Sequence, residues 1–177
     1  MGKSSGVGIA ILGLLIGIGG LSFAAYSYFT FSSQIADLKT QMEERSVKAT
    51  WYAENLIDWS PSAVNTNESI PDLTINFQVN EGESIYFSFI TRAIIYAYSG
   101  QTYIRFTFRI DGVILDAPYT IAGGLDVDEV FLYIPVALQY STNMLAAGNH
   151  TVSVIALKGY TSNFIRQSSL LVQTYVS

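Results

Sequence analysis

The chain carries Thr102-Tyr-Ile-Arg-Phe-Thr-Phe-Arg-Ile-Asp-Gly-Val-Ile-Leu115, a segment with the pattern of a β-hairpin. Apolar residues alternate with polar ones as far as Ile110, which is the period of two expected of a half-buried strand. Asp111-Gly112 follows, and this pair favours a two-residue turn because both residues tolerate a positive φ. We therefore predict a strand at 102–110, a tight turn, and a second strand at 113–115.

The predicted hairpin has one apolar face and one cationic face. Arg105 and Arg109 lie at alternate positions of the first strand and give that face two positive charges. A solvent-facing surface, or ion pairs with acidic neighbours, is the expected role of these two residues. Binding of an acidic ligand is the alternative.

Similar strand signals continue on both sides of the hairpin. Alternating or apolar runs bounded by turn residues predict further strands at residues 72–79, 84–90, 93–98, 130–138, 149–157 and 169–176. Pro135 lies inside one of these runs and places it at a sheet edge or a bulge, because proline cannot donate a ladder hydrogen bond. About eight short strands at this spacing predict a mainly β fold, with an antiparallel, jelly-roll-like β-sandwich over residues 72–177. Strand content alone leaves the strand order open.

Composition agrees with such a fold and argues against several classes of protein. The chain has 177 residues, of which 12 are Tyr and 10 are Phe, and these residues favour pleated, half-buried surfaces. It has no Cys, so no disulfide stabilises the domain. The formal net charge is −5, and this acidic excess argues against nucleic acid and anionic lipid as partners of the C-terminal domain.

An uncharged apolar stretch opens the chain. No charged side chain occurs from Ser4 to Ala36, and the run from Val7 to Phe31 is apolar throughout most of its length. At a rise of about 1.5 Å per residue, roughly 20 residues cross a hydrocarbon core about 30 Å thick. We therefore predict an N-terminal transmembrane helix at residues 1–31. A cleavable secretory signal ending near Ala24 is the alternative.

The predicted helix continues as an amphipathic stalk. A 3-4 spacing of seam positions runs through residues 32–50 with charges outside it, and residues 51–71 form a predicted connector rich in turn residues. Small and apolar residues extend the seam back into the membrane segment. The positions expected to mediate self-association are Gly13, Gly17, Leu21, Tyr28, Phe31, Ile35, Leu38 and Met42. They favour a trimer or a filament, and a solitary anchor is the alternative.

Charge asymmetry and glycosylation sequons place the C-terminal domain outside the cell. Lys3 precedes the apolar stretch and mixed charges follow it, so the positive-inside bias favours an internal N-terminus. Two sequons, Asn67-Glu-Ser69 and Asn149-His-Thr151, make Asn67 and Asn149 candidate sites of N-glycosylation. We therefore expect a single-pass membrane protein with an extracellular C-terminal domain on a cell or virion surface.

Residues suited to catalysis are scarce. The one His, His150, and the lack of Cys do not provide a His-based relay or a multi-His metal site within one chain. We expect His150 to be a turn residue whose ring binds a backbone group, with a metal ligand on a trimer axis as the alternative. Asp126, Asp128 and Glu129 form a carboxylate cluster whose hard oxygen atoms suit Ca²⁺, and a solvated acidic loop is the alternative. We expect no enzyme activity and no cofactor.

Three segments resemble parts of a known class of proteins. Leu145-Ala-Ala-Gly-Asn-His-Thr-Val-Ser-Val154 and the closing strand Ser168–Tyr175 are similar to the turn and last strands of jelly-roll heads of the complement/tumour necrosis factor class and of viral and phage surface proteins. Arg105–Ile114 is similar to the central hairpin of those heads. The resemblance covers residues 72–177 and implies a trimeric head behind a stalk or membrane helix. The chain departs from that class in lacking a collagen-like stalk.

A weaker resemblance concerns the first residues of the chain. Met1–Gly6 is a short segment with one Lys that ends in Gly before an apolar helix, and it is similar to the leader of archaeal type IV pilin-like subunits. In such a subunit the apolar helix packs in the core of an extracellular filament. The chain departs from the pilin pattern because no Glu lies early in the helix.

Together these observations predict a non-enzymatic, membrane-anchored surface protein that presents a β-sandwich head for adhesion or for coat or envelope assembly. Its expected partners are the lipid bilayer, other copies of the same chain, and a surface protein or glycan ligand, with no nucleic acid. A subunit of an extracellular filament is the main alternative. An enzyme acting on carbohydrate or lipid is a third class, which the scarcity of His and Cys disfavours.

Overall fold

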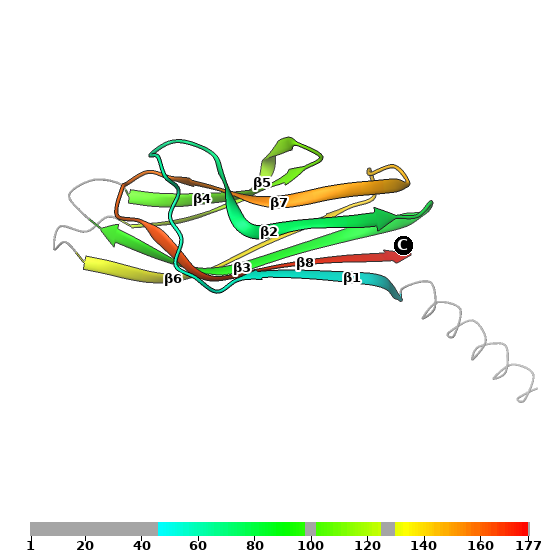
Figure 1. Ribbon diagram of the computed structural model, residues 1–177, viewed down its shortest axis with the longest axis horizontal. Helices are drawn as coiled ribbons and strands as arrows, with labels where there is room; N and C mark the ends of the chain where they lie inside the picture. Colours follow the sequence, from blue (N-terminus) through cyan, green and yellow to red (C-terminus); the bar gives the residue numbers. More distant parts are fainter. Residues whose placement is uncertain (1–45, 98–101, 125–129, 177) are drawn as a thin grey trace, which may run out of the picture. The chain divides into compact units, whose positions relative to one another are not determined.

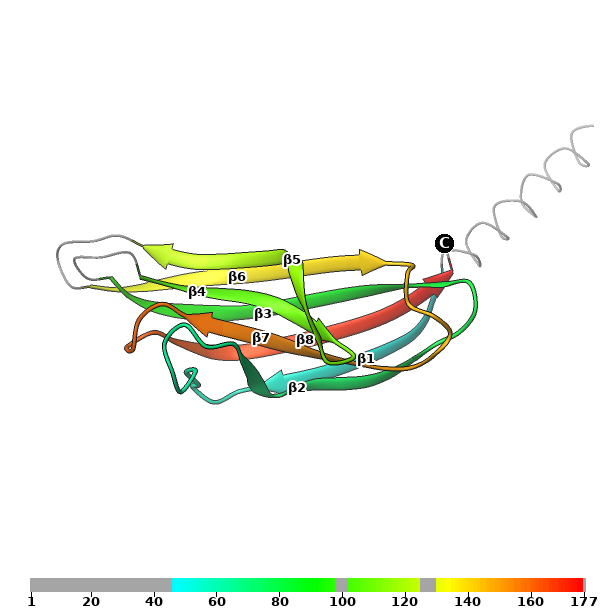
Figure 2. The same cartoon turned by 90° about the horizontal axis from the view of Figure 1, so that it is seen from above.

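Eight strands form two antiparallel sheets that face each other (Figures 1 and 2). The computed structural model describes residues 46–97, 102–124 and 130–176. The strands are β1 (Val47–Asn55), β2 (Glu68–Val79), β3 (Glu83–Ala97), β4 (Thr102–Ile110), β5 (Val113–Gly124), β6 (Val130–Thr142), β7 (Gly148–Lys158) and β8 (Phe164–Val176). One sheet has the order β1-β8-β3-β6 and the other β2-β7-β4-β5. The described part of the chain is therefore all β, and the predicted β-sandwich is confirmed.

Consecutive strands mostly alternate between the two sheets. Among the eight described strands, only β4 and β5 are both consecutive in sequence and neighbours in one sheet. This arrangement brings together segments that are far apart in the chain: β1 pairs with β8, and Val47 lies opposite Tyr175. It also places β1 and β2 side by side as edge strands of different sheets.

The core follows from the alternation along β3 and β4. Phe87 and Phe89 of β3 are fully buried, as are Phe106 and Phe108 of β4. The ring centroids of Phe89 and Phe106 lie 5.4 Å apart, and those of Phe87 and Phe108 lie 5.7 Å apart. The two pairs join one sheet to the other, as expected where inward-facing side chains of stacked sheets interdigitate.

The predicted β4–β5 hairpin is confirmed. Strand β4 has the predicted bounds, and the turn residues Asp111 and Gly112 have φ angles of 49° and 83°. Glu81 and Gly82 likewise form the turn between β2 and β3. These turns follow directly from local sequence, because few residues other than Gly, Asn and Asp adopt a positive φ without strain.

Pro135 lies in β6, which is an edge strand of its sheet. It lies opposite Arg92 of β3, and its other side has no neighbouring strand in the sheet. The predicted edge position is therefore confirmed.

Strand β3 is longer than expected. The sequence predicted separate strands at 84–90 and 93–98, because Thr91 and Arg92 interrupt the apolar pattern. The structure has one strand of 15 residues instead. Thr91 is buried, and its hydroxyl is 2.8 Å from that of Ser168, so the polar side chain has a partner in the core. The pairing of β3 with β8 has a register shift between Ile90 and Arg92, and Gln167 of β8 has a φ of 52° there.

Strand β5 also extends beyond the predicted 113–115. It continues to Gly124 through the region expected to be a loop around Pro118, and a register shift separates its two halves. Thr107 pairs with Tyr119, whereas Arg109 pairs with Ile114, so residues 115–118 are bulged out of the ladder. An edge strand accommodates such a bulge because only one side must pair.

Strand β1 corrects the expected boundaries of the stalk and the connector. Residues 47–50 were predicted as the end of a helix and residues 51–55 as connector, but Val47–Asn55 is a strand paired with β8. Trp51 is half-buried and Tyr52 is 60% exposed, which is the alternation of a strand. A short stretch with few apolar residues fits both the 3-4 spacing of a helical seam and the period of two of a strand. Pairing with β8 selects the strand. Likewise, Glu68–Pro71, expected to be connector, belongs to β2.

The predicted membrane helix and the stalk up to residue 45 lie outside the described residues. Within residues 46–97, 102–124 and 130–176, no helix has the length and apolar character needed to span a bilayer.

Candidate functional site

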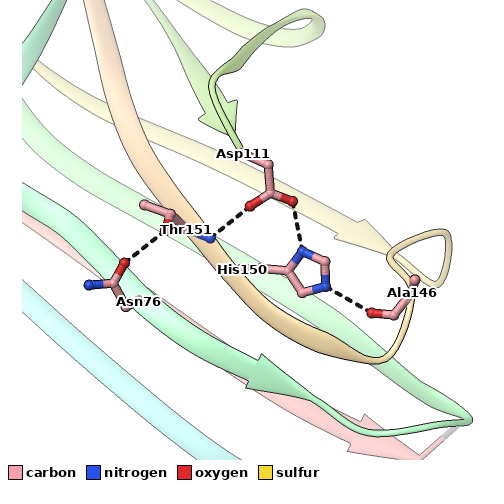
Figure 3. Close-up of polar contacts among 5 residues, drawn as sticks. All are labelled: Asn76, Asp111, Ala146, His150 and Thr151. Carbon is pink, nitrogen blue, oxygen red and sulfur yellow. Dashed lines mark hydrogen bonds and ion pairs between the residues drawn. The ribbon is translucent and has the colours of Figure 1, made fainter.

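His150 joins three segments at one end of the sandwich (Figure 3). Its Nδ1 lies 2.7 Å from Oδ2 of Asp111 in the β4–β5 turn. Its Nε2 lies 2.8 Å from the backbone oxygen of Ala146 in the loop before β7. The expectation that the ring binds a backbone group is confirmed, and the bond to Asp111 was not foreseen.

The two partners define the protonation state of the ring. A carboxylate oxygen and a carbonyl oxygen are both acceptors, so each ring nitrogen must carry a proton for both hydrogen bonds to form. The arrangement is therefore complete only when His150 is an imidazolium. The side chain of His150 is 12% exposed and that of Asp111 is 45% exposed, so the ion pair lies at the margin of the core.

Both groups titrate away from their ordinary values. The hydrogen bond to Asp111 raises the pKa of His150, burial opposes this shift, and the bond to Ala146 adds to it. Burial acts to raise the pKa of Asp111, but the hydrogen bonds from His150 and from the backbone of Thr151 outweigh it and lower that pKa. Each shift favours the charged form of its group, as expected of a paired acid and base.

Thr151 extends this network to strand β2. Its backbone N–H donates to Oδ1 of Asp111 (2.9 Å), and its hydroxyl donates to Oδ1 of Asn76 (2.7 Å; Figure 3). Asn76 and Thr151 lie directly opposite each other on β2 and β7. One connected set of polar groups therefore holds the β4–β5 turn against the edge of its sheet.

A cleft of about 540 Å³ lies beside this network. Trp51 of β1, Asn76 and Gln78 of β2, and Asn149 and Thr151 of β7 contribute to its lining. Phe77 and His150 also border it, with their ring centroids 5.7 Å apart. A volume of about 300–1,000 Å³ is typical of small-ligand sites, so this cleft is large enough to hold one.

The arrangement does not favour acid–base catalysis by His150. A general base needs a free lone pair within reach of a substrate, and both ring nitrogens are engaged by acceptors of the chain. Among the residues that the structure describes, no group of three or more His, Asp or Glu side chains lies close enough to hold a metal ion.

The candidate residues from the sequence are only partly within the described structure. Asn67 is exposed in the segment before β2, and Asn149 is exposed at the start of β7, so both asparagines are accessible. The calcium candidates Asp126, Asp128 and Glu129 lie outside the described residues. So do the positions predicted to mediate self-association, namely Gly13, Gly17, Leu21, Tyr28, Phe31, Ile35, Leu38 and Met42.

The two arginines of the predicted cationic face have partners of different kinds. The Cζ atom of Arg105 lies 4.3 Å from the centroid of the Tyr119 ring, and its Nη2 donates to the backbone oxygen of Asp116 (3.3 Å). Arg109 donates to the hydroxyl of Ser69 (3.0 Å). Neither contact is the expected ion pair with an acidic side chain. Arg105 links β4 to the edge strand β5, and Arg109 reaches across β7 to the other edge strand, β2.

Sequence reasoning also missed a buried polar cluster, around Asn163. This residue is fully buried; its Oδ1 accepts from the backbone of Tyr96 (2.9 Å), and its Nδ2 donates to the backbone oxygen of Tyr103 (3.1 Å). Nearby, the buried Nζ of Lys158 donates to the hydroxyl of Ser60 (2.9 Å). These contacts tie the connector and three strands together. The partners are distant in sequence, so no local motif signals them.

Comparison with known proteins provides little further guidance. No family model matches the chain, and no curated protein does. Among solved structures, the chain is similar to exo-β-1,3-galactanase from Phanerochaete chrysosporium in complex with β-1,3-galactotriose, with 14% identity and a TM-score of 0.23 over 74% of this chain and 28% of that one. The same enzyme with galactose matches at 15% identity and a TM-score of 0.23, over 71% of this chain and 30% of that one. The chain spans less than a third of the length of these structures, and the TM-scores are too low to define a common fold.

Proposed function

We propose that this chain is a non-enzymatic surface protein, held in a membrane by its N-terminal segment and presenting a β-sandwich head outside. The observation that carries this proposal is the order of the parts along the chain. An apolar stretch without charged side chains runs from Ser4 to Ala36, and a self-contained sandwich starts soon afterwards at Val47. An apolar stretch of that length suits a bilayer.

The strand order supports the further proposal that the head is a jelly roll. In such a fold eight strands form two Greek keys, and successive strands alternate between two four-stranded sheets. The orders β1-β8-β3-β6 and β2-β7-β4-β5, with a single in-sheet hairpin among the described strands, agree with this arrangement. Jelly-roll heads of the class that the sequence resembles are usually trimers, which favours self-association here.

Exposed apolar side chains on the first sheet support self-association as well. Tyr52, Ile90, Phe131 and Tyr133 are 60%, 55%, 49% and 64% exposed. The strand registers place all four on the outward face of this sheet. Apolar groups gathered on one face are a common feature of contact surfaces. Clustering several heads on one support raises avidity without stronger individual contacts, which suits adhesion and coat assembly.

Imaging and mass spectrometry of the same preparation test the proposal. Full-length protein in its native membrane is extracted, imaged by negative stain, and its N-terminus is identified by mass spectrometry. The proposal expects small discrete particles that retain the original N-terminus. Exchanging Leu38 and Met42 for Asp is expected to dissociate the particles, whereas the same exchange at Thr40 and Gln41, outside the seam, leaves them intact.

A filament subunit is the second candidate, favoured by the leader-like Met1–Gly6. In this case the images show fibres, and the chain begins at Val7. A monomer that is released without detergent would contradict both functions.

A further inference from the structure

We propose that the cleft beside Trp51 binds a neutral saccharide. This inference deepens the proposed adhesive function by naming the chemical class of the ligand. It starts from the position of the cleft, where β1 of one sheet and β2 of the other lie side by side as edge strands. The volume is about 540 Å³, and the lining comes from three strands of both sheets.

The outward face of β2 and β7 gives the cleft a grid of uncharged polar side chains. Asn76 lies opposite Thr151, and Gln78 lies opposite Asn149, so four such groups are immediate neighbours on β2 and β7. Asn76, Gln78 and Asn149 are exposed. Each amide offers two donors and one acceptor, which is the combination that adjacent hydroxyl groups of a sugar require.

The amides are available for a ligand. The hydroxyl of Thr151 donates to Oδ1 of Asn76, which fixes the orientation of that amide. The side chains of Gln78 and Asn149 make no hydrogen bond to any residue that the structure describes. The grid therefore combines one pre-oriented amide with two amides that a ligand can engage.

Trp51 of β1 borders the same cleft. It is half-buried, and its ring centroid lies 6.0 Å from that of Phe77, a buried residue on the opposite face of β2 from Asn76 and Gln78. The indole therefore lies at the margin of the amide grid, not across the cleft from it. An aromatic ring at this margin attracts the weakly positive C–H groups of a pyranose.

Charge argues against ionic ligands. No Asp, Glu, Lys or Arg lines the cleft, and the imidazolium of His150 is already neutralised by Asp111. An anionic ligand would find no cation free to bind it, and a cationic ligand no free carboxylate. A neutral, hydroxyl-rich ligand matches the uncharged amides and the aromatic residue at their margin.

The saccharide has two possible sources. Asn149 itself lies in a glycosylation sequon, so the first sugar of a glycan on this chain would start within the cleft. A glycan on another surface is the other source. Both present the same neutral pyranose to Trp51 and Gln78.

The first test uses the full-length chain produced without glycosylation and placed in lipid nanodiscs, because many detergents carry sugar head groups. The chain has two Trp residues, so Trp59→Phe leaves tryptophan emission from Trp51 alone. The methyl glycosides of glucose, galactose, mannose and N-acetylglucosamine are titrated into this variant. A saturable change in emission is expected for at least one of them. Gln78→Ala is expected to weaken that binding by about fivefold, the value of one net hydrogen bond.

The matched control is Gln139→Ala, since Gln139 is also exposed but lies on β6, far from the cleft in the strand order. It is expected to bind as the parent does. The proposal is overturned if no glycoside changes the emission, or if Gln78→Ala binds as tightly as Gln139→Ala. Neither result bears on the proposed function as a membrane-anchored surface protein, because imaging tests that function separately.

A second arm identifies the source. Chain produced in a glycosylating host is compared with the Asn149→Gln variant from the same host, which has no acceptor at this position and keeps an amide. If the glycan on Asn149 occupies the cleft, the glycosylated chain does not respond to added glycoside and the variant does. If both respond equally, the cleft takes sugar from another surface.

Discussion

Nδ1 of His150 lies 2.7 Å from Oδ2 of Asp111, which joins the start of β7 to the turn between β4 and β5. The same ring binds the backbone oxygen of Ala146, and the same carboxylate accepts the N–H of Thr151. One imidazolium and one carboxylate therefore hold a turn, a loop and a strand together. This network borders the cleft proposed to bind saccharide, so its charge state bears on the shape of that cleft.

The first prediction concerns the pH dependence of stability. The pKa of His150 is raised on folding, so its contribution is complete below the unfolded value of about 6.5 and is lost as the pH rises through the folded value. The pKa of Asp111 is lowered, so its contribution is present above about 3.9 and is lost as the pH falls through the folded value. The pair stabilises most between about pH 4 and 6.5.

We expect the free energy of unfolding to fall by about 1 kcal/mol between roughly pH 5.5 and 8.5, a modest value because Asp111 is partly exposed to solvent. Urea denaturation at several pH values measures this change. Asp111→Asn is the matched variant, because Asn keeps the positive φ and still accepts from Thr151. It should remove most of the pH dependence, since the amide also bonds a neutral imidazole. An unchanged pH profile in this variant would exclude the pair as its origin.

The second prediction concerns Asn163. Replacing it with Ala removes the hydrogen bond that the backbone N–H of Tyr96 donates and one of the two bonds that the backbone oxygen of Tyr103 accepts, the other coming from the N–H of Gly159. We expect a loss of roughly 1–3 kcal/mol in the free energy of unfolding, the cost of removing one partner of a buried hydrogen bond. Urea denaturation provides the measurement, with Asn143→Ala at an exposed position as the control. Equal stability of the two variants would show that the side-chain hydrogen bonds of Asn163 do not stabilise the fold.

The third prediction tests the β4–β5 turn. A Cβ at Gly112 would meet no atom within 4 Å, so Gly112→Ala changes only the backbone preference at a φ of 83°. We expect this variant to lose about 1–2 kcal/mol of stability. Gly112→Asn should lose less, because Asn adopts this conformation more readily than Ala. Thermal unfolding distinguishes the two, and a reversed order would show that the turn is not held in this conformation in solution.

The fourth prediction concerns the bulge in β5. The hydroxyl of Thr107 is buried and lies 2.8 Å from the backbone oxygen of Leu115 and 3.1 Å from that of Pro118. Thr107→Val keeps the shape and removes this donor, and we expect it to cost about 1 kcal/mol. Amide hydrogen exchange in residues 113–120 should also become faster. Thr107→Ser retains the hydroxyl and should protect these amides better than Val; no difference between the two would refute the role of the hydroxyl.

Some features of this fold were predictable because they depend on neighbouring residues. The β4–β5 hairpin follows from alternation and from Asp111-Gly112, and the edge position of β6 follows from Pro135. The contact of His150 with Ala146 spans only four residues and was expected in kind. In each case the information lies within a few residues of sequence.

Other features depend on partners far along the chain. Thr91 interrupts an apolar pattern, yet it lies in the middle of one strand because Ser168 supplies its hydrogen bond. The spacing of residues 47–50 fits a helical seam, but the segment forms a strand because it pairs with β8. The bond between Asp111 and His150 joins residues 39 positions apart, and nothing local to either residue predicts it.

The sequence by itself determined the class of the fold, because strands and tight turns are set by side-chain alternation and by which residues accept a positive φ. It also predicted a head behind an apolar N-terminal stretch. Only the tertiary structure decided the strand order and brought Trp51, Gln78 and Asn149 around one cleft. The strand order and the cleft depend on which distant strands pair and which sheet edges lie side by side. Local sequence is compatible with several such arrangements, and packing and pairing across the whole chain select one of them.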